Sequence, residues 1–231
     1  MGSLVLLSDL RDAYEPNSTA ARKVAELSKT HPQFRKIRPD GNCFYRGLLW
    51  GSLESAVRSQ SLDSYRALLK RVSLTCIEEG YDSFAIEEFH DLLDENLGLI
   101  LGHSSLALSI QQMELTFATD ASIDGYAVAF LRCACGAALK KWQEEYMAFL
   151  PEPYTSMESF CRNEVDPMNK DADEIHLVAL SRLLGLKLSV AYIDGSDSES
   201  VKIHQFGEPS SSLHVCLLYR PGHYDLIYPA S

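Results

Sequence analysis

Cys43 is the residue of this sequence with the best local setting for nucleophilic chemistry. It follows Asp40-Gly41-Asn42, residue types that favour turns and helix caps over helix interiors. The apolar residues after Cys43 recur at helical spacing, so we expect the thiol at the start of a helix. Helix amides and a nearby imidazolium can lower a thiol pKa to roughly 3.5–7.5. The alternative is a small buried hydrophobe, as most intracellular cysteines are.

The same turn offers hydrogen-bond donors for a developing oxyanion. The amides of a tight turn and of the first helical turn have no partner within the helix. Gly41 lets this backbone approach a substrate closely. The predicted oxyanion-binding backbone comprises Asp40, Gly41, Asn42 and Cys43.

A cysteine nucleophile needs a base, and the base needs a group that orients it. His223 follows Pro221-Gly222 at the predicted start of a strand, and Asp225 lies two residues further. Residues two apart share one face of a strand, so the carboxylate can accept a hydrogen bond from the imidazole. This geometry favours His223 over the other six histidines.

The other histidines lack this arrangement. His176 lies in a predicted helix among apolar residues, where a partly buried imidazole with satisfied hydrogen bonds is the better interpretation. His90 and His214 have no carboxylate at a spacing of two within a strand. His31, His103 and His204 are expected in loops or on the surface.

Cys133 and Cys135 raise the possibility of a metal site, with Cys161 and His176 to complete it. Residues two apart on a helix point in nearly opposite directions and chelate poorly. Small core residues are therefore the preferred interpretation. The sequence predicts no metal and no cofactor.

The elements that must position these residues change character along the chain. Apolar residues at three- and four-residue steps predict helices over 65–76, 86–97, 127–142 and 175–184. Ser18 is a candidate cap for an earlier helix, and Gly185 ends the last one.

Period-two alternation begins after Gly185. Strands are predicted over 186–190 and 201–203, separated by a polar turn over 194–200. The segments 213–219 and 224–228 then form a hairpin, and Pro221-Gly222 suits a type II turn. Helices followed by a late antiparallel sheet predict an α+β fold.

Length and charge narrow the function further. The 231 residues carry a net charge of −11, and no basic cluster interrupts the acidic balance, which argues against a nucleic-acid partner. We expect one domain over 1–231, with 1–20 as a short N-terminal extension. The sequence indicates a cytoplasmic protein, also compatible with the nucleus, with reduced cysteines and no membrane span.

Four motifs in order along the chain resemble the otubain branch of the ovarian-tumour (OTU) family of cysteine deubiquitinases. Residues 40–45 (Asp-Gly-Asn-Cys-Phe-Tyr) resemble the motif around the catalytic cysteine. Residues 160–168 and 172–176 are similar to two further otubain segments, and 217–228 to the hairpin with the catalytic histidine. The resemblance extends from about residue 24 to residue 228.

This resemblance implies Cys43 as nucleophile, His223 as base and Asp225 as third member of a triad. It also implies that Asp40 helps to shape the oxyanion site. The implied fold is a papain-like α+β domain with a small, mostly antiparallel sheet in the C-terminal third and surrounding helices. The implied partners of this expected monomer are ubiquitin, polyubiquitin and ubiquitin-conjugating enzymes.

The implied activity is hydrolysis of isopeptide bonds at the C-terminal glycine of ubiquitin. Two alternatives stay open: a non-catalytic protein that binds a ubiquitin-loaded conjugating enzyme, and a hydrolase of another ubiquitin-like modifier. The region 119–125 and the segment Leu131-Arg132-Cys133-Ala134-Cys135 depart from the usual otubain pattern. Linkage preference is the property most affected, because this region lies near ubiquitin in relatives.

Overall fold

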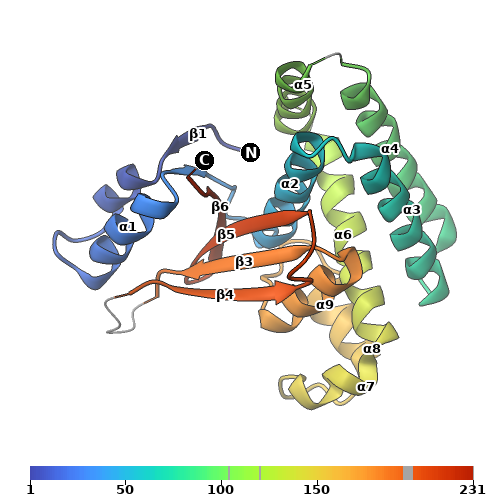
Figure 1. The fold of residues 1–231 in the computed structure, drawn as a ribbon. Coiled ribbons are helices and arrows are strands. Elements are labelled where there is room, and N and C mark those ends of the chain that lie inside the picture. Colours follow the sequence, from blue (N-terminus) through green and yellow to red (C-terminus); the bar gives the residue numbers. More distant parts are fainter. Residues whose placement is uncertain (104, 120, 195–199, 231) are drawn as a thin grey trace.

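A six-stranded sheet with the strand order β1-β2-β6-β5-β3-β4 forms the centre of the fold (Figure 1). The computed structural model describes residues 1–103, 105–119, 121–194 and 200–230. Neighbouring strands are antiparallel, except that β3 and β5 are parallel. The strands are β1 (Leu4–Leu6), β2 (Gln33–Arg35), β3 (Lys187–Tyr192), β4 (Lys202–Gly207), β5 (His214–Arg220) and β6 (His223–Tyr228).

The α+β class and the mostly antiparallel sheet are confirmed, but the sheet is not restricted to the C-terminal third. β1 and β2 extend it from the N-terminal part of the chain, and β2 pairs directly with β6. Each has three residues, too few for an alternating pattern to be recognised in the sequence. Most of the predicted polar turn over 194–200 lies outside the described residues.

The segment expected to be an N-terminal extension belongs to the folded structure. After β1 it forms the 3-10 helix η1 (Leu7–Ala13), in which Leu7 and Leu10 are buried. Together with α1 (Thr19–Thr30), it covers one face of the sheet and packs against side chains of β2, β3, β5 and β6. These apolar contacts between the N-terminal segment and the sheet hold residues 1–20 in place.

The remaining helices cover the opposite face and extend away from the sheet (Figure 1). All four helices predicted from residue spacing are confirmed, but the helix over 106–119 was not predicted. The helices are α2 (Cys43–Arg58), α3 (Leu62–Glu78), α4 (Ser83–Leu101), α5 (Leu106–Thr119), α6 (Ala121–Lys141), α7 (Gln143–Tyr146), α8 (Met157–Phe160) and α9 (Glu174–Leu184), with η2 (Met147–Phe149) and the π-helical η3 (Cys161–Val165) between them.

Local sequence signals set several of these boundaries. The Ser18 hydroxyl accepts a hydrogen bond from the Ala21 amide at 3.2 Å and caps α1. Gly185 ends α9 in the left-handed conformation, with φ of 58°. Pro221 and Gly222 connect β5 to β6, and Gly222 has φ of 73°, as the third position of a type II turn requires.

One stretch of α6, residues 122–141, is long and apolar enough to span a membrane by length and composition alone. Most of it is buried inside the protein, where α6 contacts α2, α3, α4 and α9. Arg132 lies in its middle and is fully buried with polar partners. The stretch is therefore the central core helix, and its hydropathy follows from that position.

α2 lies directly against β5 and β6, so the position of Cys43 depends on this contact. A Cβ atom on Gly51 would lie 2.7 Å from Cγ1 of Val215 and 3.0 Å from Cδ2 of Leu226. At the N-terminal end of α2, the rings of Phe44 and Tyr224 are 5.6 Å apart. Because Gly51 has no side chain on the face of α2 that meets the sheet, the helix backbone can approach the sheet closely.

We predict that Gly51→Ala and Gly98→Ala have opposite effects on stability, although both glycines are helical. Overpacking against Val215 costs about 1–3 kcal/mol, which exceeds the roughly 1 kcal/mol gained in helix propensity. A Cβ atom on Gly98 in α4 meets nothing within 4 Å, so only the gain remains. Urea unfolding measures both free energies, and equal stabilisation by the two substitutions would contradict this packing.

Candidate active site

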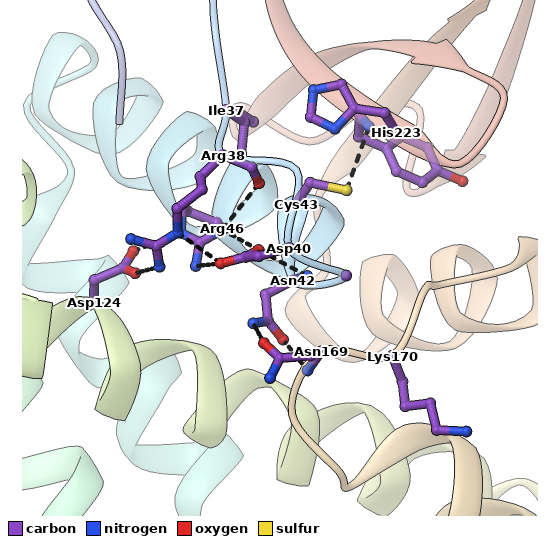
Figure 2. Close-up of polar contacts among 12 residues, drawn as sticks. Ile37, Arg38, Asp40, Asn42, Cys43, Arg46, Asp124, Asn169, Lys170 and His223 are labelled. Atoms are coloured by element: carbon purple, nitrogen blue, oxygen red, sulfur yellow. Dashed lines mark hydrogen bonds and ion pairs between the residues drawn. The ribbon is translucent and has the colours of Figure 1, made fainter.

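Cys43 is the first residue of α2 and is buried at 3% exposure. Its sulfur points toward the start of β6, beside His223 (Figure 2). There Sγ accepts a hydrogen bond from the backbone amide of Tyr224 at 3.4 Å. The structure thus places the predicted nucleophile at a helix N-terminus and next to the strand that carries the predicted base.

His223 and Asp225 form the pair that strand periodicity predicted. Nε2 of His223 lies 2.9 Å from Oδ1 of Asp225. Burial lowers the pKa of His223, but the hydrogen bond with Asp225, the charge of Asp225 and the nearby Cys43 thiol outweigh burial and raise that pKa to about 9. Because Asp225 occupies Nε2, the other ring nitrogen, Nδ1, is the one that can exchange a proton with Cys43.

Asp225 is fully buried and connects three segments of the site. Its Oδ1 also accepts the backbone amide of Ile37 at 2.8 Å, and its Oδ2 accepts a hydrogen bond from Arg220. Burial raises the pKa of Asp225, but these hydrogen bonds and the neighbouring charges prevail and lower it. The carboxylate is therefore ionised and can stabilise the imidazolium form of His223.

The carboxylate of Asp40 points away from Cys43 and into a network of charged side chains (Figure 2). Arg46 donates to both of its oxygens at 2.9 Å, and Arg38 donates at 2.7 Å. Asp124 accepts from the same two arginines at 2.7 and 3.1 Å. Burial opposes ionisation, but the two arginines hold the pKa of Asp40 well below its usual range. Asp40 thus fixes the conformation of the loop through contacts on the side that faces away from Cys43.

Of the four backbone amides predicted to bind an oxyanion, two already donate hydrogen bonds within the loop. The Asp40 amide donates to the Arg38 carbonyl at 3.1 Å, and the Asn42 amide donates to Oδ1 of Asp40 at 3.1 Å. Both amides are therefore engaged within the loop. The amides of Gly41 and Cys43 form no hydrogen bond with the described residues and are the two that can donate to a substrate oxygen.

Several residues that position the site were not singled out from the sequence. Arg46 lies one helical turn after Cys43, a spacing that could have suggested its interaction with Asp40. Arg132 and Asn169 come from distant segments, α6 and the loop before α9, and hydrogen-bond to Asn42. No local pattern connects them, because their contact depends on how α6 packs under the loop.

The remaining candidates have structural surroundings. His176 is buried, and its Nδ1 accepts the Asp173 amide at 2.9 Å, which caps α9; burial lowers the pKa of His176 to about 4. Burial raises the pKa of Cys133 and of Cys161, each to about 12. Across the described ranges, no three His, Cys, Asp or Glu side chains are grouped so that they could hold a metal ion.

We predict that the imidazole of His223 titrates near pH 9 and that Asp225→Asn lowers this pKa. The substitution removes the charge that offsets burial. The raised pKa stabilises the folded state below about pH 6.5, and this contribution is lost as pH rises through about 9. NMR titration of the imidazole measures the pKa in both proteins. An unchanged value in Asp225→Asn would contradict the assigned role of Asp225.

Comparison with known proteins gives a consistent result. The family model for Peptidase C65 Otubain matches residues 1–229. Rat "Ubiquitin thioesterase OTUB1" is 32% identical over 93% of this chain and 77% of its own length. Human "Ubiquitin thioesterase OTUB2" is 30% identical over 97% and 93%.

The fold of this chain is also similar to that of a solved otubain structure. The otubain chain in "The structure of a ceOTUB1 ubiquitin aldehyde UBC13~Ub complex" superimposes with a TM-score of 0.87 at 29% identity. The match covers 100% of this chain and 93% of that one. The sequence, the fold and the geometry around Cys43 thus lead to one conclusion: this chain belongs to the otubain family of cysteine peptidases, peptidase family C65.

Proposed function

We propose that this chain is a deubiquitinase that hydrolyses isopeptide bonds at the C-terminal glycine of ubiquitin. The observation that carries this proposal is the position of Cys43 at the start of α2, beside the His223–Asp225 pair, in a chain of the otubain family. Relatives of this chain are named ubiquitin thioesterases. The related solved structure contains ubiquitin aldehyde.

The geometry supports a mechanism with a covalent intermediate. Protonated His223 stabilises the thiolate of Cys43, which attacks the carbonyl carbon of the ubiquitin glycine. The oxyanion accepts hydrogen bonds from the amides of Cys43 and Gly41. His223 gives its proton to the leaving lysine amine, and the carbon–nitrogen bond breaks. His223 then takes a proton from a water molecule that hydrolyses the thioester.

The raised pKa of His223 suits the acid step. At pH 7 an imidazole with a pKa of about 9 carries a proton, which the leaving amine needs. The buried carboxylate of Asp225 keeps this proton on the ring by stabilising the positive charge. Asp225 therefore acts on the reaction through His223 and not by contact with substrate.

Conjugating enzymes loaded with ubiquitin are proposed as further partners. The related otubain structures are described as complexes with UBC13~Ub and UBCH5B~Ub. Inhibition by binding alone is therefore a second candidate function. It differs from hydrolysis in one testable property, because a binding protein still blocks chain synthesis when Cys43 is replaced.

A cytoplasmic, and also nuclear, location of the protein is a further proposal.

We predict that the protein forms a covalent adduct with a ubiquitin carrying a thiol-reactive C-terminal warhead. The adduct should be about one ubiquitin heavier than the protein. It should be absent in Cys43→Ala and strongly reduced in His223→Ala, because both the thiol and its base are required. Intact-mass spectrometry detects it. Circular dichroism of both variants should show that they remain folded.

Two results would change this proposal. An adduct only with another ubiquitin-like modifier would keep the hydrolase and replace its substrate. No adduct with any modifier, together with inhibition of chain synthesis that persists in Cys43→Ala, would favour the binding function. Appreciable cleavage of di-ubiquitin by Cys43→Ala would rule out Cys43 as the nucleophile.

A further inference from the structure

The interior of the protein contains an unusual cation immediately below the catalytic turn, the residues Asp40, Gly41 and Asn42 that precede Cys43. Arg132, in the middle of α6, is 0% exposed. None of the ion pairs among the described residues includes it, and its charge is satisfied by neutral oxygen atoms and an aromatic ring. A buried charge without an opposite charge is costly unless hydrogen bonds satisfy it, so the partners of Arg132 must be held in a defined geometry.

The hydrogen bonds of Arg132 join the catalytic turn to the segment before α9. Its Nε and Nη2 donate to Oδ1 of Asn42 at 3.0 and 2.7 Å. Nη2 also donates to the Gly41 carbonyl at 2.9 Å and to the Lys170 carbonyl at 2.6 Å. Nη1 donates to the Val165 carbonyl at 2.9 Å. All three guanidinium nitrogens are therefore used, in a planar arrangement that lysine cannot reproduce.

Neighbouring contacts fix the plane of the guanidinium and the position of the turn. The guanidinium carbon lies 4.3 Å from the ring centroid of Tyr45, in the first turn of α2. Asn42 and Asn169 face each other (Figure 2). Nδ2 of Asn42 donates to Oδ1 of Asn169 at 2.8 Å, and the backbone N–H of Asn169 donates to Oδ1 of Asn42 at 2.9 Å. A Cβ atom on Gly41 would lie 2.4 Å from the Asn169 carbonyl, so the two segments touch at Gly41.

The result is a peptide group held at both ends. The carbonyl of the Gly41–Asn42 peptide accepts from Arg132, and its N–H donates to Oδ1 of Asp40. Arg46 holds Asp40 in turn. The amides of Gly41 and Cys43, the two that are free to bind an oxyanion, lie on the peptides at either side and share the Cα atoms of Gly41 and Asn42 with it. Holding the Gly41–Asn42 peptide in place therefore limits the displacement of both donors.

We propose that Arg132 is a positioning residue for the oxyanion site: it holds the Gly41–Asn42 peptide so that the amides of Gly41 and Cys43 point at the substrate carbonyl. This inference rests on the proposed deubiquitinase function and assigns Arg132 a role through the turn, without contact to substrate. It follows that Arg132 contributes to acyl transfer and much less to the intrinsic reactivity of the Cys43 thiol.

The test compares two reactions of Cys43 in the same variants. Hydrolysis of a fluorogenic amide of ubiquitin passes through an oxyanion, whereas alkylation by iodoacetamide does not. In Arg132→Met we expect kcat to fall by about 10²–10³, the usual effect of losing an oxyanion donor, while KM and the alkylation rate change by only a few-fold. Arg132→Lys should not restore kcat, because the charge alone cannot hold the peptide.

A control variant tests whether the loss of any bidentate arginine lowers kcat. Arg66 of α3 donates through Nε and Nη2 to Asp94 of α4 at 2.6 Å each, and both side chains are partly exposed, so Arg66→Met removes an arginine bridge that has no contact with the turn. Its kcat should equal that of the wild type. If Arg132→Met does not fold, Asn42→Asp and Asn42→Ala replace it. Asp keeps the acceptors for Arg132 and should retain more kcat than Ala, which removes them.

Failure of the proposed deubiquitinase function and failure of the proposed role of Arg132 give different results. If the wild-type protein does not hydrolyse the ubiquitin amide, the proposed function fails and this inference with it. If the wild type is active and Arg132→Met, or Asn42→Ala in its place, keeps kcat within about three-fold, the inference alone is wrong. A parallel loss of kcat and alkylation in these variants would also overturn it, because the residue would then act on the thiol and not on the oxyanion site.

Discussion

The buried carboxylate of Asp225 is the constraint on which the geometry of the site depends. Pairing of β2 with β6 ends at Arg35 opposite Leu226. Two residues later the Ile37 amide donates to the side chain of Asp225, and the chain then turns toward Cys43. The same carboxylate orients His223 on β6. One side chain thus joins the segment that leads to the proposed nucleophile, Cys43, with the strand that carries the proposed base, His223.

The cost of burying this carboxylate explains its surroundings. An isolated ion in the protein interior is strongly destabilising, so its oxygens must be satisfied. A backbone amide, an imidazole and the guanidinium of Arg220 supply these hydrogen bonds. The Ile37 amide belongs to the segment before Cys43, and the imidazole belongs to β6, so the contacts that satisfy the carboxylate also hold these two parts of the site together.

The catalytic turn uses the same physical solution twice more. Arg46, which also pairs with Asp124 of α6, and Arg38 hold Asp40 on one side of the turn, while Arg132 holds Gly41 and Asn42 from below. These contacts link the turn to α6 and to the loop before α9. Because α2, α6 and the loop before α9 support it, the turn has a defined shape without substrate. Such preorganisation is what electrostatic stabilisation of an oxyanion requires.

Much of this arrangement could be predicted from local sequence. Helical spacing located α3, α4, α6 and α9, and the turn residues before Cys43 located the start of α2. The spacing of His223 and Asp225 on one strand predicted their hydrogen bond. These signals are local, so they survive without knowledge of the tertiary structure.

Long-range features could not be predicted in this way. The three-residue strands β1 and β2 gain their stability from pairing with β6 and not from an intrinsic pattern. The choice between free and occupied amides in the turn depends on the Asp40 carboxylate, which could have pointed elsewhere. The contact of Arg132 with Asn42 joins residues 90 positions apart and exists only after α6 has packed against α2.

The most direct test of the account is to trap the acyl-enzyme during turnover. Acid quenching of the wild-type protein, milliseconds after mixing with a ubiquitin C-terminal amide, should preserve a ubiquitin thioester. Peptide mass spectrometry should locate it on Cys43, and His223→Ala should not accumulate it. Hydrolysis without any thioester, or a thioester on another cysteine such as Cys216, would contradict the assignment of Cys43 and His223.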